Sequence, residues 1–159
     1  MRIRVLSVGK VKERYLRDAI AEYEKRLGRY CRLELMEVPD ERTPDGASEA
    51  EELLIKETEG QRLLRCIRDS DYVIALAIEG QMPDSVELAR KVERLGVQGQ
   101  SSLCFVIGGS LGLSREVLNR ADERMSFSRL TFPHQLMRVI LLEQVYRSFR
   151  IIHGEPYHK

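Results

Sequence analysis

The sequence lacks a long apolar run and lacks a cysteine pattern that would build a disulfide framework. A membrane-spanning helix needs roughly 20 consecutive apolar residues, and no stretch approaches that length. We expect no signal peptide, because Arg2 and Arg4 lie within an apolar alternation and no small-residue cleavage site follows. Cys31, Cys66 and Cys104 are odd in number and scattered, which favours buried thiols in a reducing compartment. We therefore expect a cytoplasmic protein without a membrane partner.

Net charge is also nearly absent, because the formal value is only +1. Bulk charge therefore does not indicate a nucleic-acid binder. The distribution is uneven, however: residues 34–60 are acidic, whereas residues 1–30 and 126–159 are basic. The two basic segments would form a basic patch if they met in space. The alternative is that these charges belong to separate, solvated helix faces.

The composition is that of a globular protein, with 43% hydrophobic and 32% charged residues in 159. No internal repeat, linker or low-complexity segment is visible, so we expect one domain spanning residues 1–159. Strands and helices are expected to alternate, which predicts an α/β fold with a mostly parallel sheet flanked by helices. The expected strands are residues 3–9, 33–38, 71–78, 102–107 and 125–127, and the expected helices are 12–29, 48–68, 85–95, 114–120 and 133–152.

Local signals refine three of these elements. Ser48 and Glu51 have the spacing of a capping box at the start of a helix, in which Gly60 is a weak point. The run over residues 71–78 is almost continuously apolar, which is typical of a strand buried on both faces. We expect that strand to end at Glu79 and Gly80.

A glycine-rich turn over residues 108–114 follows a predicted buried strand and precedes a helix. Open α/β sheets bind ligands at this position, beyond the carboxyl ends of their strands. Glycines there let the backbone approach a ligand closely. The spacing is not G-x-G-x-x-G and no phosphate-loop lysine follows, which disfavours dinucleotide and nucleoside-triphosphate sites. A tight turn without a ligand is the alternative.

The final helix, residues 133–152, is apolar around most of its circumference. Such a helix must be buried on more than one side. Either it packs on the sheet and on a second subunit, or it is the central core helix of a monomer. Arg138 lies among these apolar residues and needs an anionic or hydrogen-bonding partner. An ion pair with Glu143 or another acid is its structural alternative to a catalytic role.

The histidines His134, His153 and His158 all lie near the C-terminus. They lack zinc-ligand spacing on one helix face, and no cysteine accompanies them, so we expect no metal site. The chain ends in Tyr157-His158-Lys159. Loose termini seldom carry this much chemistry, so we interpret the tail as reaching toward a site.

The sequence resembles the SPOUT (α/β-knot) methyltransferases. It is most similar to the family that methylates N3 of a pseudouridine in bacterial large-subunit (23S) ribosomal RNA. The resemblance covers essentially the whole chain and is carried by residues 8–10, 105–109, 112–114, 130–138, 143–147 and 156–159. One departure is visible: Ala77 stands where the family often has an aspartate.

The resemblance implies a C-terminal trefoil knot, a homodimer and bent S-adenosylmethionine as the methyl donor, without a metal. It also implies action on the large-subunit rRNA of assembled ribosomes. By position, the residues implied to line the cofactor are Leu76, Gly108, Phe127, Ser128, Arg129, Leu130, Thr131 and Phe132.

Our mechanistic hypothesis is a composite site. Arg138 would orient the target base or neutralise its nascent anion. Tyr157 and His158 from the partner's tail would close over the nucleotide, with His158 as the proton acceptor. The alternatives are a SPOUT enzyme with another RNA target, such as a ribose 2′-hydroxyl, a ribosome-associated binding module without turnover, and a flavodoxin-like nucleotide-binding enzyme.

Overall fold

The computed structural model describes all residues from 1 to 159 and contains one five-stranded sheet. The strand order is β2-β1-β4-β3-β5, and every neighbouring pair is parallel. The elements along the chain are β1 (Arg2–Val8), α1 (Arg14–Leu27), β2 (Arg32–Val38), α2 (Glu49–Cys66), β3 (Tyr72–Gln81), α3 (Ser85–Val97), β4 (Ser102–Ile107), α4 (Arg115–Arg120), β5 (Glu123–Met125) and α5 (His134–Ile152). The predicted α/β fold with a parallel sheet is confirmed.

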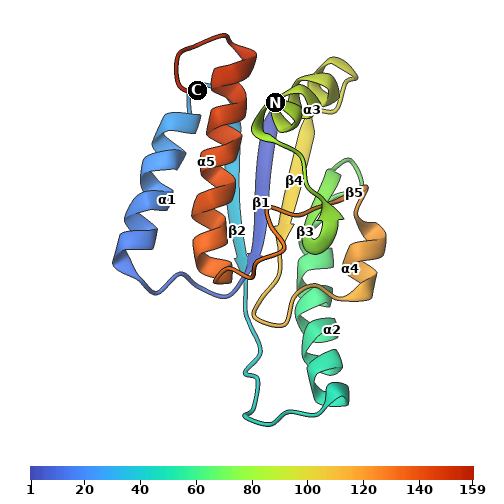
Figure 1. The fold of residues 1–159 in the computed structure, drawn as a ribbon. Helices are drawn as coiled ribbons and strands as arrows, with labels where there is room; N and C mark the ends of the chain where they lie inside the picture. Colours follow the sequence, from blue (N-terminus) through green and yellow to red (C-terminus); the bar gives the residue numbers. More distant parts are fainter.

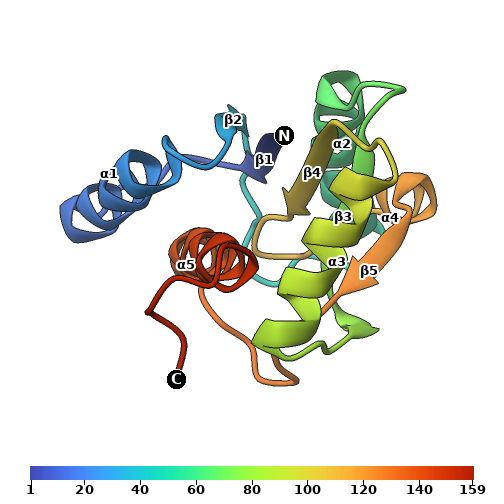
Figure 2. The same ribbon diagram turned by 90° about the horizontal axis from the view of Figure 1, so that it is seen from above.

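Helices cover both faces of the sheet (Figures 1 and 2). Helices α1, α5 and α3 lie on one face, and α2 and α4 lie on the other. Side chains of a strand alternate between the two faces. In β1, Ile3 and Val5 accordingly join the core under α1, α3 and α5, whereas Leu6 and Val8 join the core under α2 and α4. None of these helices is both long and apolar enough to cross a membrane.

The two edges of the sheet differ from its centre. All six residues of β4 are buried, as expected for a strand covered on both faces. Strand β2, at one edge, is mostly exposed or half-buried and carries the charged side chains of Arg32, Glu34 and Glu37. Strand β5, at the other edge, has only three residues.

Strand β3 continues past the point where the sequence predicts its end. It pairs with β5 from Ile74 to Leu76 and again at Gln81, with a shift of register between. Gly80 makes this return possible, because a Cβ there would lie 2.6 Å from the Met125 backbone nitrogen. The prediction that the strand ends at Glu79 and Gly80 was therefore wrong. Strand β5 ends at Met125, where the prediction had it begin, and the Ser126 side chain already bonds Ser128 in the loop that follows.

Helix α2 begins at the predicted capping box, in which Ser48 and Glu51 exchange hydrogen bonds. Gly60 is an interhelical contact rather than a weak point. A Cβ on Gly60 would lie 2.3 Å from Ser114 Oγ, and Ser114 caps the start of α4. The glycine thus lets α2 and α4 approach closely on the same face of the sheet.

The basic segments at the two ends of the sequence lie side by side, because α1 packs against α5 (Figure 1). Most basic side chains of α5 are neutralised locally. Arg138, Arg147 and Arg150 each form an ion pair with a carboxylate. Unpaired positive charge therefore concentrates at the other basic segment, around the start of α1.

Candidate functional site

A cavity of about 710 Å³ opens at the carboxyl ends of β3 and β4. Three segments and two residues of α5 line it, namely residues 76–78, 107–112, 125–128 with 130–133, and His134 and Met137. This is the edge at which parallel α/β sheets hold ligands. The structure thus brings the glycine-rich turn and the loop after β5 together around one space.

The glycine-rich turn forms a wall of closely packed backbone. A Cβ on Gly108 would lie 2.7 Å from the carbonyl carbon of Gly112, and Gly112 itself has a φ of +89°. A Cβ on Gly109 would lie 3.1 Å from the carboxylate of Glu59, a buried residue of α2. These positions need glycine because there is no room for a side chain or because φ is positive. The cavity consequently meets peptide groups on this side.

The opposite wall is a loop organised by serines. The Ser126 hydroxyl donates to the Ser128 carbonyl and lies 3.2 Å from the Ser128 nitrogen, which donates to it. The Ser128 hydroxyl then accepts a hydrogen bond from the Leu130 nitrogen at 3.0 Å. Such side-chain turns hold a short loop in one conformation. Phe127 packs against the core, whereas Leu130 is 71% exposed at the cavity rim.

The structure brings seven of the eight expected cofactor-contacting residues to this cavity, namely Leu76, Gly108, Phe127, Ser128, Leu130, Thr131 and Phe132. Arg129 is exposed and does not border the cavity. The lining also includes the side chains of Ile78, His134 and Met137, which the sequence did not single out as cofactor contacts. Of these, His134 brings a titratable group.

His134 stands at the first position of α5, where it follows directly on the loop after β5. Burial lowers the pKa of its imidazole, and the positive charge of Arg138 lowers it further. A lowered pKa leaves the ring neutral near pH 7 and able to accept a proton. The sequence indicates a place for His134 at the cavity only by its position, immediately after the segment that resembles a cofactor loop.

Arg138 does not border this cavity, although it lies one turn beyond His134 on α5. Its Nη2 donates to the carbonyl oxygens of Val8 and Gly9, both at 2.8 Å, and its Nη1 donates to Glu37 at 2.5 Å. The partner is therefore Glu37 of β2 and not Glu143, which pairs with Arg147. Burial lowers the pKa of Arg138, and the Glu37 carboxylate opposes that shift. The guanidinium thus joins the start of α5 to the end of β1.

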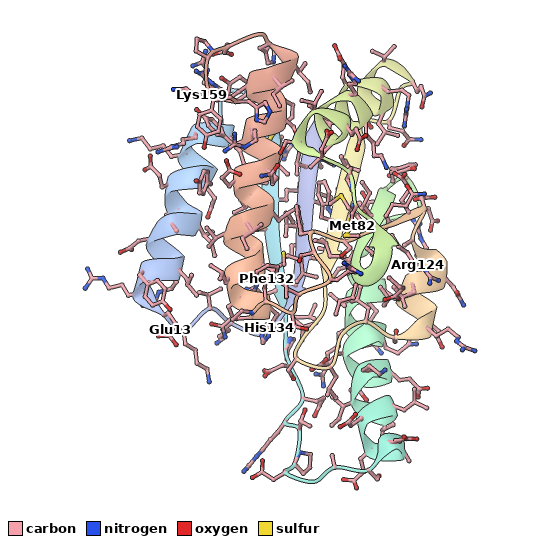
Figure 3. The ribbon with its side chains drawn as sticks, in the orientation of Figure 1. Glu13, Met82, Arg124, Phe132, His134 and Lys159 are labelled. Atoms are coloured by element: carbon pink, nitrogen blue, oxygen red, sulfur yellow. The ribbon has the colours of Figure 1, made fainter.

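Tyr157 and His158 do not border the cavity. Figure 3 shows Lys159 of the same tail well away from His134, which lies at the start of α5. The Tyr157 hydroxyl donates to Glu143 at 3.0 Å, and its ring meets Tyr146 edge-on. His158 Nδ1 lies 3.1 Å from Arg147 Nη1. Glu143 lies nine residues beyond His134 on α5, or roughly 13 Å along the helix at 1.5 Å per residue. Within one chain, the expected catalytic residues Arg138, Tyr157 and His158 are thus not brought together at the cavity.

No group of three or more histidine, cysteine, aspartate or glutamate side chains is arranged so that it could hold a metal ion.

Known proteins with similar sequences share the full length of this chain. The family described as "Predicted SPOUT methyltransferase" matches residues 1–158. Proteins named "Ribosomal RNA large subunit methyltransferase H" from Clostridium botulinum (strain Eklund 17B) and Clostridium perfringens (strain 13) are 58% and 59% identical over 159 residues, and the match covers 100% of both chains in each case.

Two solved structures share the fold at low sequence identity. A probable methylase family protein from Haemophilus influenzae is 16% identical with a TM-score of 0.55, and the match covers 99% of this chain and 70% of that one. A probable methyltransferase from Bordetella pertussis is 16% identical with a TM-score of 0.58, and the match covers 93% and 96%. These similarities concern the fold alone.

Proposed function

This chain belongs to the SPOUT methyltransferase family and is an enzyme, and from that premise we propose the reaction it catalyses. It transfers a methyl group from S-adenosylmethionine to N3 of a pseudouridine in 23S ribosomal RNA, and it acts on assembled ribosomes. The observation that carries the proposal is the cavity at the carboxyl ends of β3 and β4, because the segments that resemble the family's cofactor loops wall it. The names of the full-length relatives support the ribosomal substrate.

The residues of the cavity fit S-adenosylmethionine. Leu76, Phe127 and Phe132 offer apolar surface for an adenine ring, and the turn over residues 108–112 offers peptide groups at close range. When bound, this cofactor supplies an electrophilic methyl carbon on a sulfonium. Gly108, Ser128, Leu130 and Thr131 complete the set that we propose holds it. Arg129 is left out because its side chain does not border the cavity.

The chemistry requires a precise approach of N3 to the methyl carbon and loss of the N3 proton. We assign Arg138 a positioning role, because its donors to Val8, Gly9 and Glu37 tie down the start of α5. That helix start carries His134 into the cavity wall. His158 of the tail is the proposed proton acceptor, and His134 is the second candidate from the chain's own cavity.

Tyr157 and His158 do not border the cavity of their own chain, so we infer that the tail serves the cavity of another copy. We propose a homodimer whose α5 helices run antiparallel, so that Tyr157 and His158 of one protomer cover the cavity of the other. Leu136, Val139 and Ile140 of α5 are only partly buried and supply apolar surface for that contact. We also propose that the C-terminal segment is threaded as a trefoil knot.

The test is methyl transfer from labelled S-adenosylmethionine to ribosomes that lack the modification, in parallel with protein-free rRNA, followed by identification of the labelled nucleoside. We expect label on N3 of a pseudouridine in large-subunit RNA of assembled particles. Label on a ribose 2′-hydroxyl would overturn the proposed target. Cofactor binding without transfer to either substrate would overturn the ribosomal substrate while leaving the cofactor site intact.

A further inference from the structure

An exposed tyrosine lies among exposed basic residues at the start of α1. Tyr15 is 71% exposed, although tyrosine usually buries most of its ring. Lys10, Lys12, Arg14 and Arg17 surround it in sequence and are all exposed. We refer to these five residues as the α1 patch. Its four basic residues outnumber the two acidic residues of the same stretch, Glu13 and Asp18.

The basic residues of the α1 patch have no ion-pair partner. Arg17 donates one hydrogen bond to the Lys12 carbonyl, and none of the four forms a salt bridge. By contrast, Arg26, further along α1, pairs with Glu22. Uncompensated cations on a surface attract anions and release counterions when an anion binds.

The α1 patch lies at the edge of the sheet that holds the cofactor cavity. Ser7 of β1 pairs in register with Ile107 of β4, so the loops that follow both strands leave the sheet at the same end. A Cβ on Gly109, in the cavity wall, would lie 3.2 Å from Val8 Cγ1, and Arg138 of α5 binds the carbonyl of Gly9. Figure 3 shows Glu13 and His134 at this end of the molecule.

A second cavity, of about 500 Å³, opens beside the α1 patch. Lys10 and Arg17 border it, and polar groups of Ser7, Glu24 and Glu37 lie on its walls. The surface next to Tyr15 is therefore hollowed and carries both hydrogen-bond donors and acceptors. That combination suits an irregular polar polymer better than a flat apolar face.

We propose that the α1 patch binds ribosomal RNA beside the target nucleotide, with the four cations on phosphates and Tyr15 stacked on an unpaired base. This proposal rests on the function proposed above. Single-stranded RNA is held in this way, by cations along the backbone and aromatic rings against bases. A second copy of the chain is a poorer occupant, because a two-fold contact would place four cations against the same four.

The charge of the α1 patch is tested with the double variant Lys10→Gln/Lys12→Gln. Its matched control is Arg65→Gln/Arg90→Gln, which removes the same charge from exposed positions on α2 and α3. Binding to unmodified large subunits is measured across a series of KCl concentrations. We expect the patch variant to lower the slope of log affinity against log salt by about one per lost phosphate contact. The control should keep the wild-type slope.

The ring of Tyr15 is tested separately by Tyr15→Leu and Tyr15→Phe. Leucine keeps apolar surface without a ring, so we expect affinity for the subunits to fall by about tenfold, as for loss of one stacked base. Phenylalanine keeps the ring and should bind as the wild type does. Affinity for S-adenosylhomocysteine and the sedimentation coefficient should be unchanged in every variant.

The outcomes separate this proposal from the proposed function. Wild-type protein that methylates ribosomes, together with patch variants that bind them normally, would overturn the α1 patch alone. Patch variants that change oligomeric state would also overturn it, since the patch would then be a subunit interface. Wild-type protein that binds S-adenosylhomocysteine but neither binds nor labels ribosomes would overturn the proposed function and the patch with it.

Discussion

Position 108 has no room for a side chain, because the backbone of Gly112 lies directly beside Gly108. A Cβ would lie 2.7 Å from the Gly112 carbonyl carbon and 2.9 Å from its oxygen, and both are backbone atoms that cannot rotate away. Gly108→Ala therefore has to displace the turn that walls the cavity. We predict a loss of S-adenosylhomocysteine affinity of at least about tenfold, or ~1.4 kcal/mol, measured by titration calorimetry.

The matched control is Gly28→Ala. Gly28 has a helical φ of −56°, and its Cβ would meet the Lys25 carbonyl at 3.4 Å, an ordinary contact. This variant should bind as the wild type does and unfold at the same urea concentration or a slightly higher one. Wild-type affinity in Gly108→Ala would show that the turn does not shape the cofactor site.

The buried thiol of Cys104 makes the free energy of unfolding depend on pH in the alkaline range. Burial raises the pKa of this thiol to about 12, whereas an unfolded cysteine ionises near pH 8.5. Above pH 8.5 the unfolded chain loses a proton that the folded chain keeps, so the free energy of unfolding falls as pH rises, by up to about 1.4 kcal/mol per unit for this thiol. Cys31, with its pKa raised to about 11 by burial, adds in the same direction.

The measurement is the free energy of urea unfolding between about pH 8 and pH 11. Cys104→Ala should be less stable throughout, because it leaves a small void, but its stability should fall less steeply with pH. Tyr72 and Tyr157, both with pKa values raised to about 12 by burial, contribute equally to the two proteins. Parallel curves would contradict the prediction.

At the scale of elements, hydrophobic periodicity locates the strands and helices well where their contacts are local. The bounds of β4 agree with the prediction at both ends, because all its residues are buried and turn residues flank it. Hydrophobic periodicity does not predict that β3 continues to Gln81. That continuation depends on the contact of Gly80 with the backbone of β5, more than 40 residues further along the chain. Pairing across such separations leaves no local pattern.

The same limit applies to the site. The residues alone indicate a ligand at the glycine-rich turn, and only the family resemblance points to the loop over residues 127–132. Arg138 was expected to need an anionic or hydrogen-bonding partner, which is confirmed. Its carboxylate partner is 101 positions away in the sequence, at Glu37. A nearer acid, Glu143, was the natural guess from the helix alone.

The C-terminal tail has a predicted role that the structure allows us to isolate. Tyr157 touches Glu143 and Arg147, which lie nine and thirteen residues along α5 from His134 in the cavity wall. Deleting residues 157–159 should therefore leave S-adenosylhomocysteine affinity within about twofold while transfer to ribosomes falls at least about a hundredfold, the lower range for losing a general base. Both are measured on the purified protein with labelled cofactor.

Two single variants divide the effect of that deletion. Tyr157→Phe keeps the edge-on contact with Tyr146 and should retain most activity. His158→Gln keeps a polar group of similar size but cannot take the proton, and it should lose most of the rate. A tail-deleted enzyme with full activity would exclude the tail from the reaction and leave His134 as the candidate acceptor.

For the whole molecule, the separation of tail and cavity predicts that two copies share each site. We pair the tail-deleted chain with a second chain that carries Gly108→Val, whose side chain would clash with the Gly112 backbone and distort the cavity. Neither variant should be active alone. In a mixed dimer, however, the intact cavity of one protomer meets the intact tail of the other. Co-refolded at equal amounts, they should recover about a quarter of wild-type transfer, because half the dimers are mixed and one site in two works.

Recovery of transfer on mixing is not possible if each tail serves its own chain, since every site would then contain one defect. The controls are the two variants refolded separately and a mixture prepared without refolding, which keeps protomers from exchanging. An inactive co-refolded sample that sedimentation shows to contain dimers would contradict the shared site.

The two edge strands of the sheet limit the ways in which copies of this protein can associate, and they disfavour growth into a polymer. A bare edge strand is a template on which the next chain can add its own strand, and repeated addition gives filaments. Here β2 carries the charged side chains of Arg32, Glu34 and Glu37, and β5 is three residues long and flanked by loops. Neither edge offers a register that a neighbour could extend. In the proposed homodimer the two copies therefore meet through helical faces, where the contact closes on itself and growth ends at a finite particle.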